Sequence, residues 1–423
     1  MKINTQKLSY EEVQRLPKFQ HKLPRKPSRF LATVVRLVSI PSLRKTNFSY
    51  TTEGMDKVGD QPCLILMNHS SFTDMKLAYG IFYPKPLGIV STVDGMTGIL
   101  GKLMRLLGCT PTHKFVSDIS LIRDMEYMLK TLKTNVLMYP EASYSFDGTA
   151  TTLPRKLGVL MKKLGVPVVT VITKGAFHRD PLYNMLQIRN VQVSAHVKCI
   201  ASAEELKTLS VAELDARLDE SFSFDNFAWQ RDEKIVIDEP FRADGLHRIL
   251  YKCPHCLAEN RMEGRGTGLT CLSCGKHWEM DVYGQMQANE GETEIPHIPD
   301  WYAWERACVR KELEEGTYLL DEEVSIAVQV NLDGLYMIGD GRLVHNQDGF
   351  HLVSNDGALD YSQSPLSSYS LYSDYYFYEI GDVIGIGNTE YAYFCFPKGN
   401  VSVAKARLAA EELYKLKKQR KKV

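Results

Sequence analysis

Short apolar runs that alternate with helical patterns limit this chain to few folds. Residues 63–67, 135–139 and 166–172 are short and mostly apolar, as buried strands are. Residues 118–133 lie before the second run and repeat apolar residues at helical spacing, and residues 190–199 add an alternating strand. Strands that alternate with helices predict an α/β sheet, in which functional side chains gather at the strand ends.

The composition is that of a globular protein with room for several cores. The chain has 423 residues, of which 44% are hydrophobic and 24% charged, and its formal net charge is zero. A neutral chain has no global field that attracts nucleic acid, so nucleic acid is not expected as a partner. Basic residues nevertheless gather near both ends, which suits an anionic membrane surface or a solvated tail. They are Lys18, Lys22, Arg25, Lys26 and Arg29, then Lys415, Lys417, Lys418, Arg420, Lys421 and Lys422.

Nothing in the sequence predicts a membrane span or an export signal. The first residues are polar, and no apolar run reaches the ~18 residues that a spanning helix needs. Residues 30–41 predict a shorter helix that ends at Pro41, with one strongly apolar side next to the basic residues. That pattern is typical of an interfacial helix, and a buried packing helix is the alternative. We therefore predict residues 1–50 to be a basic segment that contacts a membrane surface.

A histidine and an aspartate follow the first predicted strand. The strand ends at Met67, a polar loop follows, and a helical pattern starts near Phe72, so His69 lies at a strand exit. Asp74 falls in the first helical turn, from which its carboxylate can reach the imidazole, fix the tautomer and raise the basicity of the other nitrogen. Such a pair suits a general base. The alternative is a turn that caps the helix, with Asp74 favouring the helix N-terminus.

A second block strengthens the first interpretation. Tyr139-Pro140-Glu141-Ala142-Ser143 follows another predicted strand. In this order and spacing, Asn68-His69 with Asp74 and this block resemble the first and third motifs of the glycerol-phosphate and lysophosphatidate acyltransferases. Residues 108–114 and 166–169 resemble the second and fourth motifs, and the resemblance covers about residues 60–200.

The resemblance implies a fold, a reaction and a set of site residues. It implies a mixed-sheet αβα acyltransferase domain, which we place at residues 51–245. His69 would deprotonate an acceptor hydroxyl that attacks the acyl thioester of acyl-CoA or acyl-carrier protein, with Asp74 orienting the ring. Glu141 would help to bind a glycerolipid acceptor such as 1-acylglycerol-3-phosphate. The further acceptor-binding candidates are Ser143, Lys114 and Lys156, the two lysines as point charges for a phosphate.

The third block departs from the family pattern. The family's Gly-Thr-Arg is replaced by Ala142-Ser143-Tyr144, which keeps a hydroxyl and loses the guanidinium that grips a phosphate. Two alternatives to a phosphate-bearing acceptor therefore stay open: acyl transfer to a non-phosphate acceptor, and a non-catalytic lipid- or partner-binding scaffold on a degenerate fold. The sequence has no Gly-x-Ser-x-Gly elbow, so a covalent acyl-enzyme is not expected.

Four cysteines predict a metal site after this domain. Cys253-x-x-Cys256 and Cys271-x-x-Cys274, with fourteen residues between the pairs, have the spacing of a four-cysteine zinc ribbon. Four thiolates leave no open position for a substrate, so the predicted Zn²⁺ is structural. We place this ribbon at residues 246–285. Reduced cysteines and the lack of an export signal predict a cytoplasmic protein, peripheral on the inner face of the cell membrane.

The remaining sequence predicts a helical linker and a β-rich region. Residues 286–320 contain a helix that ends near Gly316. Residues 321–423 predict a small barrel or sandwich with a final helix over residues 403–418. Four Asp-Gly pairs mark its expected hairpins, at residues 333–334, 340–341, 348–349 and 356–357.

Overall fold

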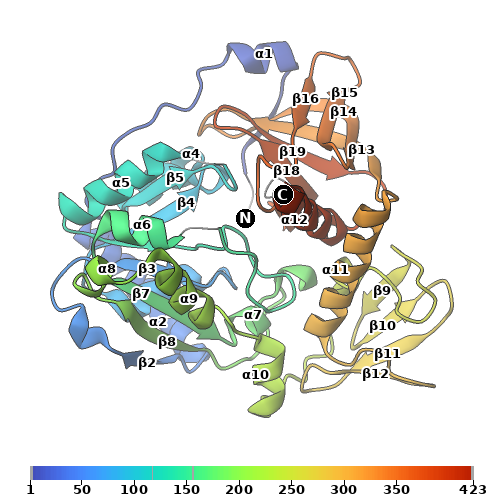
Figure 1. The fold of residues 1–423 in the computed structure, drawn as a ribbon, viewed down its shortest axis with the longest axis horizontal. Helices are drawn as coiled ribbons and strands as arrows, with labels where there is room; N and C mark the ends of the chain where they lie inside the picture. The colour runs from blue at the N-terminus through green and yellow to red at the C-terminus, as the bar shows by residue number, and fades with distance from the viewer. Residues whose placement is uncertain (1–2, 117, 155–156, 421–423) are drawn as a thin grey trace.

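A mixed seven-stranded sheet forms the first part of the molecule. The computed structural model describes residues 3–116, 118–154 and 157–420, and the strand order of this sheet is β2-β8-β7-β3-β6-β4-β5 (Figure 1). Only β7 and β8 pair antiparallel among its neighbours, so the predicted mixed α/β sheet is confirmed. Its strands are β2 (Ser49–Glu53), β3 (Leu64–Met67), β4 (Leu87–Thr92), β5 (Cys109–Thr112), β6 (Asn135–Met138), β7 (Val168–Lys174) and β8 (Ser194–Ala201).

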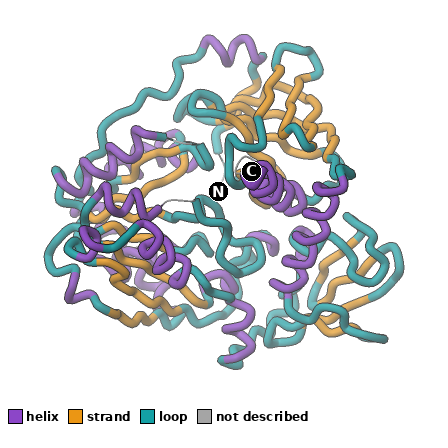
Figure 2. Tube along the Cα trace, viewed as in Figure 1, coloured by secondary structure: helices purple, strands orange, loops and turns teal. Residues whose placement is uncertain are grey.

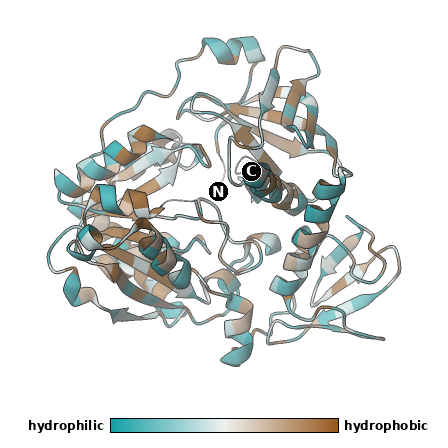
Figure 3. Cartoon of the chain, viewed as in Figure 1, coloured by the Kyte–Doolittle hydropathy of each residue, from teal (hydrophilic) through white to brown (hydrophobic). Residues whose placement is uncertain are grey.

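Helices cover both faces of this sheet. In β3, Ile65 and Met67 belong to one apolar core and Leu64 and Leu66 to another, because alternate side chains of a strand point to opposite faces. The first core takes residues from α2 (Arg29–Lys45) and α3 (Asp74–Phe82). The second core takes residues from α5 (Ile119–Lys130), α6 (Leu157–Leu164) and α9 (Val211–Ser221). The layers are therefore helix, sheet and helix, as predicted, and the central strands β3 and β7 are largely apolar (Figure 3).

Helix α2 is longer than predicted. Pro41 lies inside it, so the prediction that the helix ends at this proline was wrong. A proline removes one helical hydrogen bond, but the residues after it are fixed by packing. Leu43 is buried and approaches Gly80 of α3, where an added Cβ would lie 3.1 Å from its Cδ1. Helices α2 and α3 therefore pack closely beyond the proline.

The remaining short elements lie around this sheet or between it and the other parts of the molecule. They are α1 (Tyr10–Arg15), α4 (Gly98–Leu106), α7 (Ala176–Arg179), α8 (Glu205–Thr208) and α10 (Asn226–Asp232), with 3-10 turns η1 (Met55–Lys57), η2 (Asp94–Met96), η3 (Leu182–Asn184) and η4 (Leu246–Arg248). No helix within the described ranges is long and apolar enough to cross a bilayer.

An eight-stranded sheet forms the C-terminal region. Its order is β16-β15-β14-β13-β19-β18-β17, and β1 (Thr5–Lys7) pairs in parallel with β14. The other strands are β13 (Leu320–Gln329), β14 (Leu335–Asn346), β15 (Gly349–Ser354), β16 (Asp360–Gln363), β17 (Tyr372–Phe377), β18 (Gly381–Gly387) and β19 (Ala392–Pro397). Helix α12 (Val403–Arg420) packs against β17 and β18, so the predicted β-rich region with a terminal helix is confirmed.

One predicted hairpin turn of this region is wrong. The Asp-Gly pairs at 333–334 and 356–357 lie between successive strands, and Asp348 lies just before β15, which begins at Gly349, but Asp340 and Gly341 lie inside β14. There they pair with Ser325 and Val324 of β13, next to a bulge where the register shifts after Ile326. A glycine is common near a β-bulge as well as in a hairpin turn, so an Asp-Gly pair can mark either.

A small four-stranded sheet and a long helix lie between the two larger sheets in sequence. The strand order of the small sheet is β12-β11-β10-β9, and all its neighbouring strands are antiparallel. Its strands are β9 (Met262–Arg265), β10 (Gly268–Cys271), β11 (His277–Met280) and β12 (Met286–Ala288). Helix α11 (Ile298–Glu315) follows (Figure 2), and Gly316 in the left-handed conformation ends it. Trp278 of β11 and Trp301 of α11 are fully buried, with edge-to-face rings 5.2 Å apart. One apolar core includes these rings and side chains of the C-terminal sheet, such as Val324 and Ile384.

Candidate active site and metal centre

The loop between β3 and α3 places His69 beside Asp74. Asn68 fixes this loop, because its Oδ1 accepts a hydrogen bond from the Thr173 amide of β7 at 2.8 Å. His69 Nδ1 lies 2.9 Å from Asp74 Oδ2. The same carboxylate oxygen accepts the amides of Ser70 at 2.9 Å and Ser71 at 3.2 Å. Asp74 therefore both organises the start of α3 and orients the imidazole. The turn at the helix start and the His–Asp pair, which were alternatives in the sequence, are both present.

Two tyrosines enclose the imidazole. Tyr139 stacks on one side of the His69 ring with centroids 4.1 Å apart, and Tyr144 stacks with centroids 3.8 Å apart. Tyr144 also stacks on Phe72 at 5.2 Å. The histidine side chain is 17% exposed and the aspartate 1%. The ring plane of His69 is therefore fixed by stacking as well as by its hydrogen bond.

Burial shifts both groups toward their uncharged forms. Loss of water, with a smaller contribution from the Lys114 charge, lowers the pKa of His69 well below its ordinary value. Burial raises the pKa of Asp74 to about 8, against the effect of the Ser71 and Ser70 amides. A neutral ring that donates its Nδ1–H in a hydrogen bond to Asp74 has a free lone pair on Nε2. This is the form of histidine that can accept a proton.

A large cavity adjoins His69. Its volume is about 1140 Å³, and its wall includes His69, Asp74, Tyr139 and Tyr144. Apolar side chains from α4 and α6 form another part of the wall: Leu100, Met104, Leu157 and Leu160. The C-terminal region supplies an aromatic part that includes Tyr369, Tyr372, Tyr376, Phe377, Tyr378 and Tyr414. The cavity thus lies between the α/β unit and the C-terminal sheet.

Two of the predicted acceptor ligands face away from this cavity. Tyr139, Pro140, Ala142 and Tyr144 line it, and Glu141 and Ser143 do not. The Glu141 carboxylate accepts the amide of His69 at 2.9 Å and that of Thr151 at 2.7 Å. Ser143 Oγ accepts a hydrogen bond from Arg407 Nη2 at 2.6 Å. Glu141 therefore joins two loops, Ser143 joins its loop to α12 (Val403–Arg420), and neither side chain lines the cavity.

Of the two predicted phosphate-binding lysines, only Lys114 is among the described residues. Lys114 lines the cavity, with its Nζ 3.9 Å from the centroid of the Tyr372 ring. Burial lowers the pKa of Lys114, and the Asp374 and Asp94 carboxylates oppose that effect. Burial raises the pKa of Asp374 to about 6, which the Lys114 charge limits. Lys156 lies outside the described residues.

The contribution of the C-terminal region to the cavity could hardly be predicted from the sequence. Tyr372 and Tyr378 of the β17 segment donate hydrogen bonds to Asp94 Oδ2, each at 3.0 Å, and so attach this wall to the α/β unit. Arg407 of α12 contacts the third block, and its sequence context is that of an ordinary helical arginine. The tyrosine-rich stretch at residues 361–378 is the one compositional signal, and its alternating aromatic residues predict only strands.

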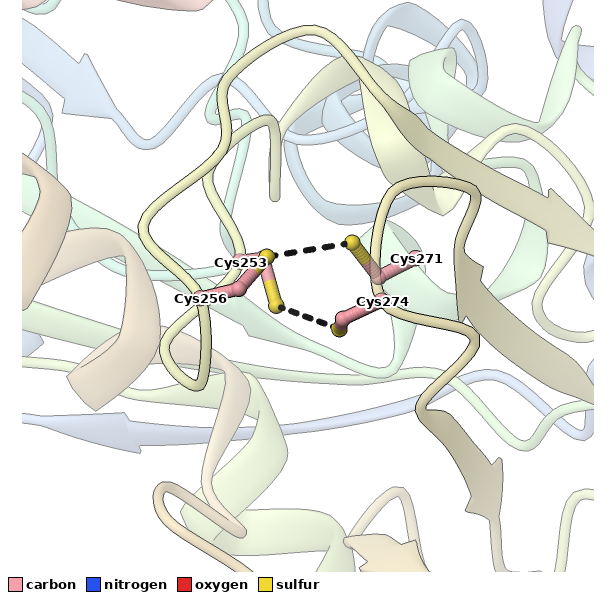
Figure 4. Close-up of side chains that lie close together, drawn as sticks. All are labelled: Cys253, Cys256, Cys271 and Cys274. Carbon is pink, nitrogen blue, oxygen red and sulfur yellow. Dashed lines mark hydrogen bonds between the residues drawn. The ribbon is translucent and has the colours of Figure 1, made fainter.

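The four cysteines meet at one point (Figure 4). Their sulfurs all lie within 4.8 Å of one another, with Cys253–Cys274 at 3.9 Å and Cys256–Cys271 at 3.6 Å. Tetrahedral Zn²⁺ with Zn–S distances of about 2.3 Å places its sulfurs roughly 3.8 Å apart, so the donor set fits this ion. Gly275 has a φ of +77°, and its amide donates to the Cys271 carbonyl at 2.8 Å. The cluster can therefore hold a metal ion through the knuckle geometry that ribbons use.

Comparison with known proteins addresses the first part of the chain. Residues 49–174 match the family model described as Acyltransferase, and this range contains His69, Asp74 and the third block. These residues form an acyltransferase domain. No curated protein matches the chain. One similar solved structure is the 1-acyl-sn-glycerophosphate (LPA) acyltransferase PlsC from Thermotoga maritima, at 18% identity and a TM-score of 0.37, over 45% of this chain and 76% of that one.

Proposed function

We propose that this protein transfers a fatty acyl group from a thioester donor, acyl-CoA or acyl-carrier protein, to a hydroxyl of a glycerolipid acceptor such as 1-acylglycerol-3-phosphate. The observation that carries the proposal is the His69–Asp74 pair, which lies within the acyltransferase domain at the wall of the large cavity. A neutral imidazole oriented by a carboxylate is the arrangement that a general base requires.

In the proposed reaction the acceptor attacks the thioester directly, and no covalent acyl-enzyme forms. Nε2 of His69 takes the proton of the acceptor hydroxyl while the oxygen attacks the thioester carbonyl. The tetrahedral intermediate then breaks its carbon–sulfur bond, and the proton on Nε2 passes to the leaving thiolate. General-base help of this kind contributes roughly 10²–10⁴ in rate. Asp74 keeps the ring in the required tautomer and stabilises the imidazolium as it forms.

Glu141 supports this base in our proposal. Its carboxylate connects the amide of His69 with that of Thr151, so it fixes the first block against the third. The apolar wall from α4 and α6 suits the acyl chain, because burying methylene groups there is favourable by about 0.8 kcal/mol each.

A non-phosphate acceptor is the second candidate. Lys114 is the one lysine or arginine in the described part of the cavity wall, and its charge faces Asp374 and Asp94. Three carboxyl groups besides Asp74 also line the cavity, those of Asp94, Asp374 and Glu379. This balance disfavours a phosphate dianion, so a neutral or amine-bearing acceptor competes with 1-acylglycerol-3-phosphate.

We also propose that the protein is cytoplasmic and binds the inner face of the cell membrane as a peripheral protein. Exposed apolar side chains lie on α2 and on α4, where Ile99 is 85% exposed. The two helices meet, since the amide of Ser28 donates to the Leu106 carbonyl at 2.9 Å. Exposed cations, among them Lys22 and Lys26, precede α2 and would face anionic lipid. The exposed apolar residues are Phe30, Val34, Leu37 and Val38 of α2 and Ile99, Leu100, Leu103 and Leu106 of α4.

Structural Zn²⁺ completes the proposal. Cys253, Cys256, Cys271 and Cys274 would hold the ion, and it would stabilise the small sheet between the two larger ones.

An acceptor panel tests the reaction. Purified protein receives acyl-CoA or acyl-carrier protein with lysophosphatidate, neutral lyso-lipids or amines, and mass spectrometry identifies the product. His69→Ala should abolish product, whereas His196→Ala should not, since His196 is an exposed histidine that pairs with Glu53 away from the cavity. Equal rates for wild type and His69→Ala would overturn the mechanism. Lipid binding without turnover would favour the scaffold alternative.

A further inference from the structure

Arg407 of α12 reaches the third block of the acyltransferase domain. Its Nη2 donates to Ser143 Oγ at 2.6 Å, and its Nη1 donates to the carbonyl of Tyr144 at 3.2 Å. The arginine is 3% exposed, although 264 residues separate it from Ser143. A guanidinium has several donors in one plane and can therefore fix two acceptors of one loop together.

The arginine is itself fixed by a buried network. Its guanidinium lies 4.5 Å from the centroid of the Phe146 ring, and its Nε donates to Glu411 at 3.4 Å. Glu411 also accepts hydrogen bonds from Arg306 at 2.7 Å and Thr152 at 3.1 Å. Burial raises the pKa of Glu411, but the charges of Arg306 and Arg407 outweigh burial and lower it to about 2. The carboxylate therefore stays charged and keeps the arginine in place.

The loop that Arg407 contacts holds one residue in an unfavourable backbone conformation. Ala142 has a φ of +54°, a left-handed conformation that costs an L-residue other than glycine roughly 1–2 kcal/mol. Two positions later, the Tyr144 ring lies on the His69 ring at 3.8 Å. A displacement of Tyr144 would therefore change both the orientation and the hydration of His69.

We infer that Arg407 is a positioning residue for the acyl transfer proposed above: through Ser143 and the Tyr144 carbonyl it keeps the tyrosine on the His69 ring. The inference rests on that proposed function. Arg407 does not line the cavity, so it acts through the loop and not on a substrate. It follows that the C-terminal helix is part of the catalytic apparatus of the acyltransferase domain.

Two variants of Arg407 test the inference against a control on the same helix. Arg407→Gln removes the charge, and Arg407→Lys keeps the charge but lacks the planar guanidinium that can donate to two acceptors. Lys405→Gln is the matched control, because Lys405 pairs with Glu259 and Glu312 and contacts neither Ser143 nor Tyr144. We expect kcat of Arg407→Gln to fall by about a hundredfold with little change in KM. Arg407→Lys should recover part of this loss, and Lys405→Gln should retain kcat.

A spectroscopic readout separates positioning from overall stability. The His69 ring resonances, assigned by comparison with His69→Ala, should titrate closer to the ordinary histidine value of about 6.5 in Arg407→Gln, because a loosened stack admits water. If this variant does not fold, Arg407→Lys and Ser143→Ala carry the test, and each should lower kcat and shift the titration. An active, folded Arg407 variant with wild-type kcat and titration would overturn the inference and leave the proposed function intact. A shifted titration in a protein without acyl transfer would overturn the proposed function and support the positioning role.

Discussion

Glu141→Gln distinguishes a loop-joining carboxylate from an acceptor ligand. In the structure one carboxylate oxygen accepts the amide of His69 and the other that of Thr151. Glutamine keeps the shape, but only its carbonyl oxygen can accept, so its NH₂ group must face one of the two backbone donors. A lost hydrogen bond to a charged group costs about 1.5–3 kcal/mol, and the donor left unsatisfied costs about 1–3 kcal/mol. Because the cost of the lost hydrogen bond and the cost of the unsatisfied donor overlap, we expect the free energy of unfolding to fall by about 3 kcal/mol.

The kinetic consequence follows from the position of His69. A catalytic group misplaced by about 1 Å can lose about 10²-fold in rate, so kcat should fall by up to that order while KM for the acceptor stays within roughly threefold. Denaturant unfolding measures the stability, and steady-state kinetics with varied acceptor measures kcat and KM. Glu126→Gln is the control, since Glu126 is an exposed carboxylate that pairs with Lys130. A raised KM for the acceptor with unchanged stability would refute the reasoning and restore Glu141 as an acceptor ligand.

Three further predictions concern other parts of the molecule. Because burial raises the pKa of Asp74 to about 8, activity should fall as the pH drops through that value, and in Asp74→Asn this limb of the pH–rate profile should disappear along with most of kcat. Cys256→Ser should reduce bound zinc from about one ion per chain to none and lower the melting temperature, as metal analysis and calorimetry would show, whereas Cys308→Ser, outside the cluster, should retain the metal. Leu103→Asp on α4 should reduce sedimentation with anionic vesicles at least about tenfold, and Leu319→Asp, an exposed leucine elsewhere, should not; equal binding would contradict the proposed membrane surface.

The parts of the fold that depend on local pattern could be predicted from the sequence. The apolar run at residues 63–67 corresponds to β3, and the one at residues 135–139 to β6, because central strands must be apolar on both faces. The helix stop at Gly316 was also predictable, since a left-handed residue after a helix favours glycine. Pro41 and the Asp340-Gly341 pair misled the prediction, because packing against Gly80 and a β-bulge outweighed local preference.

The candidate site could be predicted only in part, for a similar reason. Five residues separate His69 from Asp74, so their contact follows from one loop and one helical turn. The direction of the Glu141 side chain depends on the amide of Thr151, and the position of Arg407 depends on how α12 packs. Neither has a signature in the sequence around it. Residues joined through tertiary structure alone have no spacing that a single sequence reveals.

The pairing of β1 with β14 sets an order on how this chain can become complete. Thr5 lies opposite Leu335, so the strand made first on the ribosome has no partner until more than three quarters of the chain has been made. Nascent chains generally fold from the N-terminal side, in units that close as they emerge. Here the seven-stranded sheet can form before residues 5–7 have a partner strand, and the C-terminal part of the cavity wall is synthesised last. The cavity at His69, whose wall includes Tyr414 of the final helix, can therefore be complete only when synthesis of the chain is nearly finished.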